Sequence, residues 1–136
     1  MTAVLTLPPV PAPEVVNATV EGWHDGDTVT VWVHRGGSDY SRWHVRLRGA
    51  ACNELDDPGG PETRDEVNAR IPAGTPVVLL QVTDDKYGGR KLARVIVAGA
   101  TGGSVDLAAQ LVADGWAMPW NGRGEQPRVP WPREGR

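Results

Sequence analysis

Hydrophobic and polar residues alternate in three successive segments of the first half of the chain. Segments 16–21, 28–33 and 42–48 each place Val, Ala, Trp or Leu at every second position, with polar or charged residues at most of the others. A period of two residues predicts strands with one buried face. The Asp25-Gly26 pair between the first two segments is typical of a hairpin turn. We therefore expect three antiparallel strands, beginning near Val16.

The second half of the chain combines helical and strand signals. A first helix is expected from Pro61 to just before Pro72, because Pro suits a first helical position and ends a preceding helix. A second is expected with Ser104 as its N-cap, leucines three and seven residues later on one face, and Gly115 as its stop. Segments 76–82 and 92–97 are apolar enough for two further strands.

The two ends of the chain lack any hydrophobic period. Residues 1–15 contain four prolines, and residues 121–136 are rich in Pro, Gly and Arg. Pro removes backbone donors and favours extended conformations. We expect a flexible N-terminal segment at 1–15, one domain at 16–120, and a C-terminal tail at 121–136 that lies on the body through Trp131.

Length and composition limit the classes of protein that need to be considered. A chain of 136 residues is long enough to bury one core. A single cysteine, Cys52, cannot form an internal disulfide, and three scattered histidines give no zinc-site spacing. A net charge of -3 argues against nonspecific coating of nucleic acid but allows a locally basic cleft. With no membrane-spanning run and no basic leader, we expect a cytoplasmic monomer without a membrane partner.

Three short runs combine turns with charged residues at the edges of the expected strands. They are residues 25–28 (DGDT), 46–54 (RLRGAACNE) and 85–93 (DKYGGRKLA). Arg offers a planar fork of donors for phosphate oxygens, and a carboxylate holds a hard cation or takes a proton from water. If folding gathers the three turns, the residues suit chemistry on a phosphate.

These runs, in this order, resemble the motifs of the thermonuclease family, also called staphylococcal-nuclease-like. Residues 20–31 are similar to its opening hairpin, 45–54 to its central motif, 85–93 to its third motif with one extra Gly, and 107–117 to its closing helix. The resemblance covers residues 16 to 120. It implies an α+β fold that is mainly β, a five-stranded OB-fold barrel with two or three short helices.

The resemblance also implies an activity and a set of site residues. The family hydrolyses DNA or RNA phosphodiester bonds, commonly with calcium, so we expect a nuclease using one weakly bound Ca²⁺, with Mg²⁺ or Mn²⁺ as alternatives. By position, the resemblance implies that Arg46 and Arg90 bind the phosphate and that Glu54 orients or deprotonates water. The implied metal ligands are Asp27 and the carbonyl of Cys52. The implied contacts to a terminal phosphate are Lys86 and Tyr87. Trp120 is a candidate for stacking on a base.

Two positions depart from the family pattern. The second metal-binding Asp falls on Ala51, and the Pro that usually precedes the Glu is Asn53. Because calcium takes about 6 to 8 oxygen ligands, the loss of one carboxylate should weaken the site. Asp56 or Asp57, or waters, could compensate.

Simpler interpretations remain open at each position. Asp25-Gly26 by itself predicts only a turn, and Arg48 is better explained as a solvated strand residue. The main alternative function is a nuclease-like fold without catalysis that binds nucleic acid or protein. A weaker alternative is an accessory part of a larger assembly.

Overall fold

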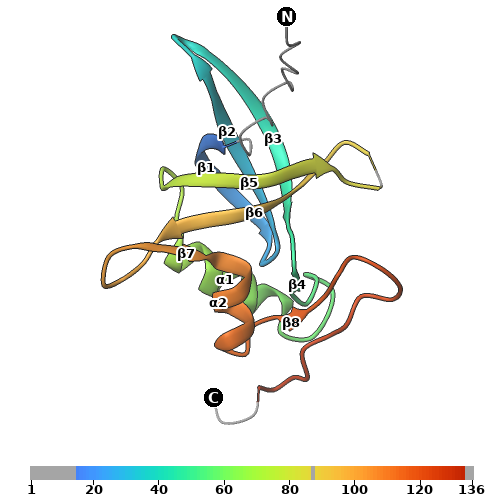
Figure 1. The fold of residues 1–136 in the computed structure, drawn as a ribbon. Helices are drawn as coiled ribbons and strands as arrows, with labels where there is room; N and C mark the ends of the chain where they lie inside the picture. The colour runs from blue at the N-terminus through green and yellow to red at the C-terminus, as the bar shows by residue number, and fades with distance from the viewer. Residues whose placement is uncertain (1–14, 87, 134–136) are drawn as a thin grey trace, which may run out of the picture.

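Five strands close into a barrel (Figure 1). The computed structural model describes residues 15–86 and 88–133. The barrel strands are β1 (Val15–Asp25), β2 (Thr28–Gly36), β3 (Asp39–Leu47), β5 (Pro76–Asp84) and β6 (Lys91–Ala98). Antiparallel pairings join β3 to β2, β2 to β1, β1 to β5 and β5 to β6, and a parallel pairing of β3 with β6 closes the ring. The predicted α+β class, mainly β with an OB-like barrel, is confirmed at this level.

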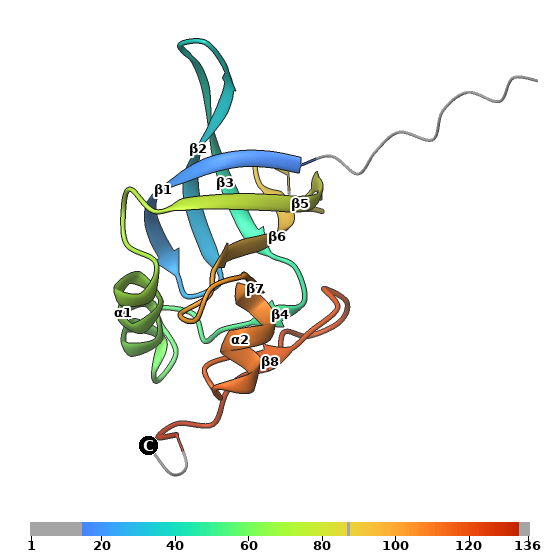
Figure 2. The same ribbon diagram turned by 60° about the vertical axis from the view of Figure 1, so that its left-hand side comes forward.

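The remaining elements lie at one end of the barrel. They are β4 (Ala50–Ala51), α1 (Gly60–Arg70), β7 (Ser104–Asp106), α2 (Leu107–Ala113) and β8 (Met118–Pro119). Strand β7 extends the sheet beside β6, and β4 pairs with β8. Figure 2 shows the two helices below the barrel and the β2–β3 hairpin projecting from the opposite end.

The alternating residues of the barrel strands form the core. Val16, Ala18 and Val20 of β1 are buried, as are the three alternating valines of β2, while most of their polar neighbours stay at least partly accessible. Val67 of α1 and Leu111 of α2 are fully buried and close the lower end of this core. The period of two residues therefore located the buried faces correctly.

One predicted helix boundary is wrong. Ser104 belongs to β7, and the N-cap of α2 is Asp106, whose side chain accepts a hydrogen bond from the backbone N–H of Ala108 at 3.0 Å. Ser104 pairs with Ala98 of β6 instead. The pairing of β7 with β6 outweighs the capping preference of serine.

The interpretation of Arg48 as a solvated residue is also wrong. Arg48 is half-buried, and its Nη2 donates to the carbonyl of Gln81 at 2.9 Å and to Oγ1 of Thr83 at 2.7 Å. Its Nε is buried without a partner among the described residues. The side chain therefore links the end of β3 to β5.

Some predictions fall wholly or partly outside the described residues. The flexible segment at 1–15 does so except for Val15, and Tyr87 does so as well. Within the described ranges, no helix is long and apolar enough to cross a membrane.

Candidate functional site

The β1–β2 hairpin turn places a carboxylate beneath the barrel. Asp25 pairs with Thr28, which leaves Gly26 and Asp27 as the turn. A Cβ at Gly26 would lie 2.8 Å from Cγ2 of Thr63 and 3.0 Å from Sγ of Cys52. Gly is therefore needed here because the turn packs closely against α1 and the loop after β4. This packing directs Asp27 inward, where it is 3 % exposed.

Strand pairing brings Arg46 to Asp27. Thr28 lies opposite Arg46 in the β2–β3 register, and the backbone N–H of Leu47 donates to the carbonyl of Asp27 at 2.9 Å. Nη2 of Arg46 lies 3.2 Å from Oδ2 of Asp27. Arg46 is itself only 7 % exposed. The alternation predicted Arg46 on an open face; instead it is buried, with access to a cavity described below.

Asp27 receives hydrogen bonds from three groups. Besides Arg46, the backbone N–H of Cys52 donates to Oδ2 at 2.9 Å, and the hydroxyl of Thr28 donates to Oδ1 at 3.1 Å. Burial raises the pKa of Asp27 above its ordinary value, and the Arg46 guanidinium acts in the opposite direction. Burial, together with the Asp27 charge, also raises the pKa of the Cys52 thiol well above its ordinary range. Cys52 is therefore a protonated, buried thiol at neutral pH.

Glu54 and Arg90 reach the same place from two loops. Glu54 is exposed on the loop after β4, and Arg90 precedes β6, two residues before the Leu92 that pairs with Arg46. One cavity of about 300 Å³ is lined by Asp27, Arg46, Glu54 and Arg90. Nε and Nη2 of Arg90 are held by Oδ2 of Asp85, at 2.8 and 2.6 Å. Asp25 lines the same cavity, so the structure gathers three carboxylates and two guanidinium groups around one opening.

Trp120 lies between this cavity and a larger groove. Its ring centroid is 4.6 Å from Cζ of Arg46 and 5.6 Å from Nζ of Lys86. The groove, of about 930 Å³, is lined by Trp120, Lys86 and Arg46 together with Arg48 and Arg123, among others. Nζ of Lys86 also donates to the carbonyl of Gly122 at 2.6 Å. The stacking role of Trp120 stays a prediction, and its observed contacts are with cations.

Asp56 and Asp57 do not line the cavity. Asp56 is exposed. Oδ2 of Asp57 accepts a hydrogen bond from the backbone N–H of Glu54 at 3.4 Å and lies 3.4 Å from Nε of Arg128. Asp57 therefore orders the loop that carries Glu54.

The donor set does not fit a resident calcium ion. Both oxygens of Asp27 already accept hydrogen bonds, the carbonyl of Cys52 accepts one from Nε2 of Gln126 at 3.0 Å, and Ala51 offers a methyl group with no exposed surface. In residues 15–86 and 88–133, no three His, Cys, Asp or Glu side chains are grouped closely enough to hold a metal ion. We therefore derive no step through a cation.

Gln126, like its neighbour Gly124, lines the cavity and was not indicated by the sequence. It comes from the C-terminal segment and accepts a hydrogen bond from Nη2 of Arg46 at 3.3 Å while donating to Cys52. No local pattern could have found it, because residues 121–133 have no hydrophobic period. The sequence signal related to this segment was Asn53, which stands where the family usually has Pro.

Asn53 explains how the C-terminal segment is held. Its amide donates to the carbonyl of Val129 at 2.9 Å and accepts from the N–H of Val129 at 2.8 Å. Asn53 is only 3 % exposed. This reciprocal pair imitates one rung of a β-ladder, which a Pro could not supply.

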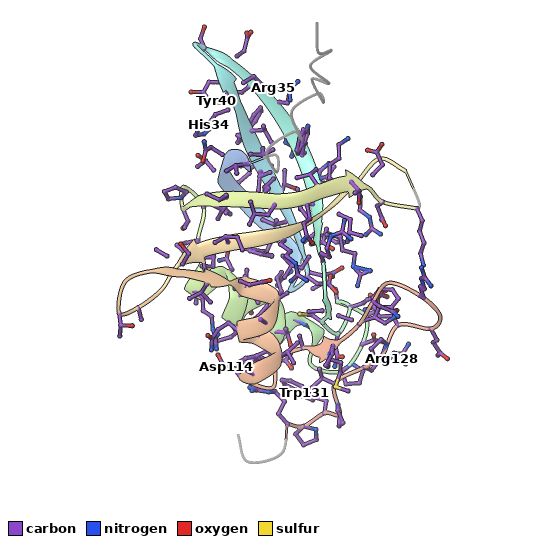
Figure 3. The ribbon with its side chains drawn as sticks, in the orientation of Figure 1. His34, Arg35, Tyr40, Asp114, Arg128 and Trp131 are labelled. Carbon is purple, nitrogen blue, oxygen red and sulfur yellow. The ribbon has the colours of Figure 1, made fainter. Side chains whose placement is uncertain are left out.

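The end of the segment packs under the helices (Figure 3). The ring of Trp131 occupies the space where a Cβ of Gly59 would lie, and it also contacts Trp116 at 6.4 Å between ring centroids. Arg133 covers the other aromatic ring, with its Cζ 3.4 Å from the centroid of Trp116. Residues 121–133 are therefore docked on the body through several contacts, of which Trp131 is one.

Comparison with known proteins identifies no relative of this chain. No protein-family model matches the sequence, and no curated protein matches it.

Proposed function

We propose that this chain is a phosphodiester hydrolase of thermonuclease-like fold that acts on DNA or RNA. The observation that carries the proposal is the single cavity lined by Asp27, Arg46, Glu54 and Arg90. These residues come from a hairpin turn, the end of β3 and two loops, which is the arrangement that the family-like motifs require. The closed five-stranded barrel supports the same proposal.

The arginines are suited to bind the phosphate. Nη2 of Arg46 is used by Asp27 and Gln126, whereas Nε and Nη1 have no hydrogen-bond partner among the described residues. Arg90 lies at the same cavity with its guanidinium fixed by Asp85. Two fixed guanidinium groups stabilise the charge that builds up on a pentacovalent phosphorus, and such preorganised electrostatics is usually the largest catalytic contribution.

Glu54 is suited to act on the attacking water. It is the exposed carboxylate of the cavity, while Asp27 is buried and hydrogen-bonded by its neighbours. In the proposed step, Glu54 takes a proton from water as the water oxygen bonds to phosphorus. The bond from phosphorus to the leaving oxygen breaks, and that oxygen takes a proton from solvent. Asp27 holds Arg46 in place.

A second function is favoured by a specific observation. Asp27 is neutralised by Arg46, and Ala51 provides no carboxylate beside it. A site that has lost one cation ligand but keeps two arginines could bind nucleic acid without cutting it. The groove beside Trp120 extends this basic surface.

One experiment separates the two functions. Single-stranded DNA, duplex DNA and RNA are each incubated with the protein in Ca²⁺, Mg²⁺, Mn²⁺ or EDTA, and the products are resolved on denaturing and native gels. Shortened products that disappear in Glu54→Gln support the hydrolase. Retarded but intact nucleic acid in all conditions supports the binding module, and the absence of both cutting and retardation contradicts both.

A further inference from the structure

Gln126 contacts two groups at the cavity, the guanidinium of Arg46 and the backbone carbonyl of Cys52. Oε1 accepts from Nη2 of Arg46 at 3.3 Å, and Nε2 donates to the carbonyl of Cys52 at 3.0 Å. Both polar ends of one neutral side chain are therefore engaged at the cavity. The side chain also forms part of the cavity wall.

The geometry of guanidinium makes the contact with Arg46 significant. A guanidinium group offers two forks for a phosphate, the Nε–Nη2 side and the Nη1–Nη2 end, and both use Nη2. The two N–H bonds of Nη2 point to Asp27 and to Gln126. A phosphate can use either fork of Arg46 only after one of these partners has left.

Gln126 is the partner that can leave. Asp27 is 3 % exposed, charged, and held by Cys52 and Thr28 as well as by Arg46. Gln126 is half-buried and neutral, and it comes from a segment without regular secondary structure. A phosphate oxygen brings a negative charge to the Arg46 guanidinium, whereas the amide oxygen of Gln126 is neutral and the carboxylate of Asp27 is already charged. Phosphate therefore replaces Gln126 more readily than it replaces Asp27.

The segment is attached on both sides of Gln126 but not rigidly at it. Three residues after Gln126, Val129 is held by Asn53. Three residues before Gln126, the carbonyl of Arg123 accepts a hydrogen bond from Nε1 of Trp120 at 2.9 Å. Gly124, with φ of 73°, lies between these attachments. Residues 124–127 can therefore swing outward while Arg128, paired with Asp57, and Val129 stay docked.

We infer that Gln126 is an autoinhibitory contact, an internal occupant of the phosphate subsite on Arg46 that substrate must displace. The inference rests on the proposed function in one respect, that this cavity accepts a phosphate. It adds that the full chain binds phosphate more weakly than it would if Gln126 did not occupy Nη2 of Arg46. It also assigns a role to residues 121–133, which the sequence left as a tail.

Binding measured without catalysis tests this inference. Inorganic phosphate and a fluorescein-labelled single-stranded oligonucleotide are titrated in EDTA into the full chain, Gln126→Ala and Gln126→Leu. The Leu variant keeps most of the side-chain volume, so the wall of the cavity is preserved. Gln110→Ala is the matched control, because it removes an exposed amide on α2 whose Nε2 bonds Asp114 instead of the cavity.

Release of one neutral hydrogen bond predicts that both Gln126 variants bind about two- to tenfold more tightly than the parent chain. Gln110→Ala should bind as the parent does. In the parent, phosphate should shift the NMR signals of the Gln126 side-chain amide, which leaves the Cys52 carbonyl, and leave the Val129 amide protected from hydrogen exchange. Unchanged or weaker binding by both Gln126 variants, in a parent that binds and cuts nucleic acid, overturns the inference alone. If no variant binds phosphate or the oligonucleotide, the proposed function fails together with it.

Discussion

Nη2 of Arg46 lies 3.2 Å from Oδ2 of Asp27, and both side chains are almost completely buried. Removal of one partner of a buried ion pair strongly destabilises the folded protein, because the remaining charge is buried away from water without a counter-charge. Each residue therefore affects both the fold and the site. Experiments on this pair need a readout of stability beside the readout of function.

Replacement of Arg46 should damage both properties. Arg46→Ala leaves Asp27 buried without its cation, so we expect the free energy of unfolding to fall by about 3–5 kcal/mol. Arg46→Lys keeps a charge but loses the planar fork, so it should retain more stability while nucleic-acid cleavage falls about 100- to 1000-fold. Urea unfolding and cleavage rates measure the two effects. Arg42→Lys, on the same strand but in an exposed pair with Glu21, is the control and should change neither.

Replacement of Glu54 should separate binding from cleavage. Glu54→Gln keeps the shape of the side chain but cannot take a proton, so we expect the cleavage rate to fall about 100-fold or more. Oligonucleotide affinity should be retained or rise, because a negative charge has left the cavity. Glu62→Gln on α1 is the matched control. Equal cleavage by Glu54→Gln and the parent would remove Glu54 from the mechanism.

The buried carboxylate predicts a pH dependence of stability. The pKa of Asp27 is raised above its ordinary value of 3.8 mainly by burial, so the folded state binds its proton more tightly than the unfolded state does. Stability associated with Asp27 is therefore complete below pH 3.8 and is lost as the pH rises through the folded-state pKa. Urea unfolding of the parent and Asp27→Asn from about pH 4 to pH 7 checks this. The stability of the parent should fall relative to that of Asp27→Asn as the pH rises.

The control for this titration is Asp39→Asn, which removes an exposed carboxylate at the start of β3. It should follow the parent across the series. A parent that gains stability relative to Asp27→Asn with rising pH would mean that the donors around Asp27 outweigh its burial.

Gly60, at the start of α1, packs against the loop that carries Glu54. A Cβ at Gly60 would overlap the backbone carbonyl of Glu54, so Gly60→Ala must push this loop outward. We expect a loss of about 1–3 kcal/mol in unfolding free energy, as for other overpacked positions, together with reduced cleavage. Gly22→Ala, where nothing lies within 4 Å of the new methyl group, should have a much smaller effect. Unchanged cleavage in a destabilised Gly60→Ala would show that the position of Glu54 does not depend on this contact.

The sequence alone determined the strands, because alternation of buried and accessible side chains is a local property of the chain. It placed β1, β2, β3 and the buried face of α2, and it singled out Asp27, Arg46, Glu54 and Arg90. The start of α2 was predicted two residues too early because serine favours capping positions, whereas Ser104 pairs with Ala98 in the sheet and Asp106 caps the helix.

The tertiary structure alone decided how exposed each of these groups is and what contacts it. Arg46 looked accessible from its strand pattern, yet Thr28 opposite it and the turn below bury it against Asp27. Gln126 lies eighty residues from Arg46, in a segment with no period to reveal a partner. Contacts of this kind depend on the reciprocal hydrogen bonds of Asn53 with Val129 and on the space left by Gly59 for Trp131. Such complementarity arises only when distant segments meet in the folded chain.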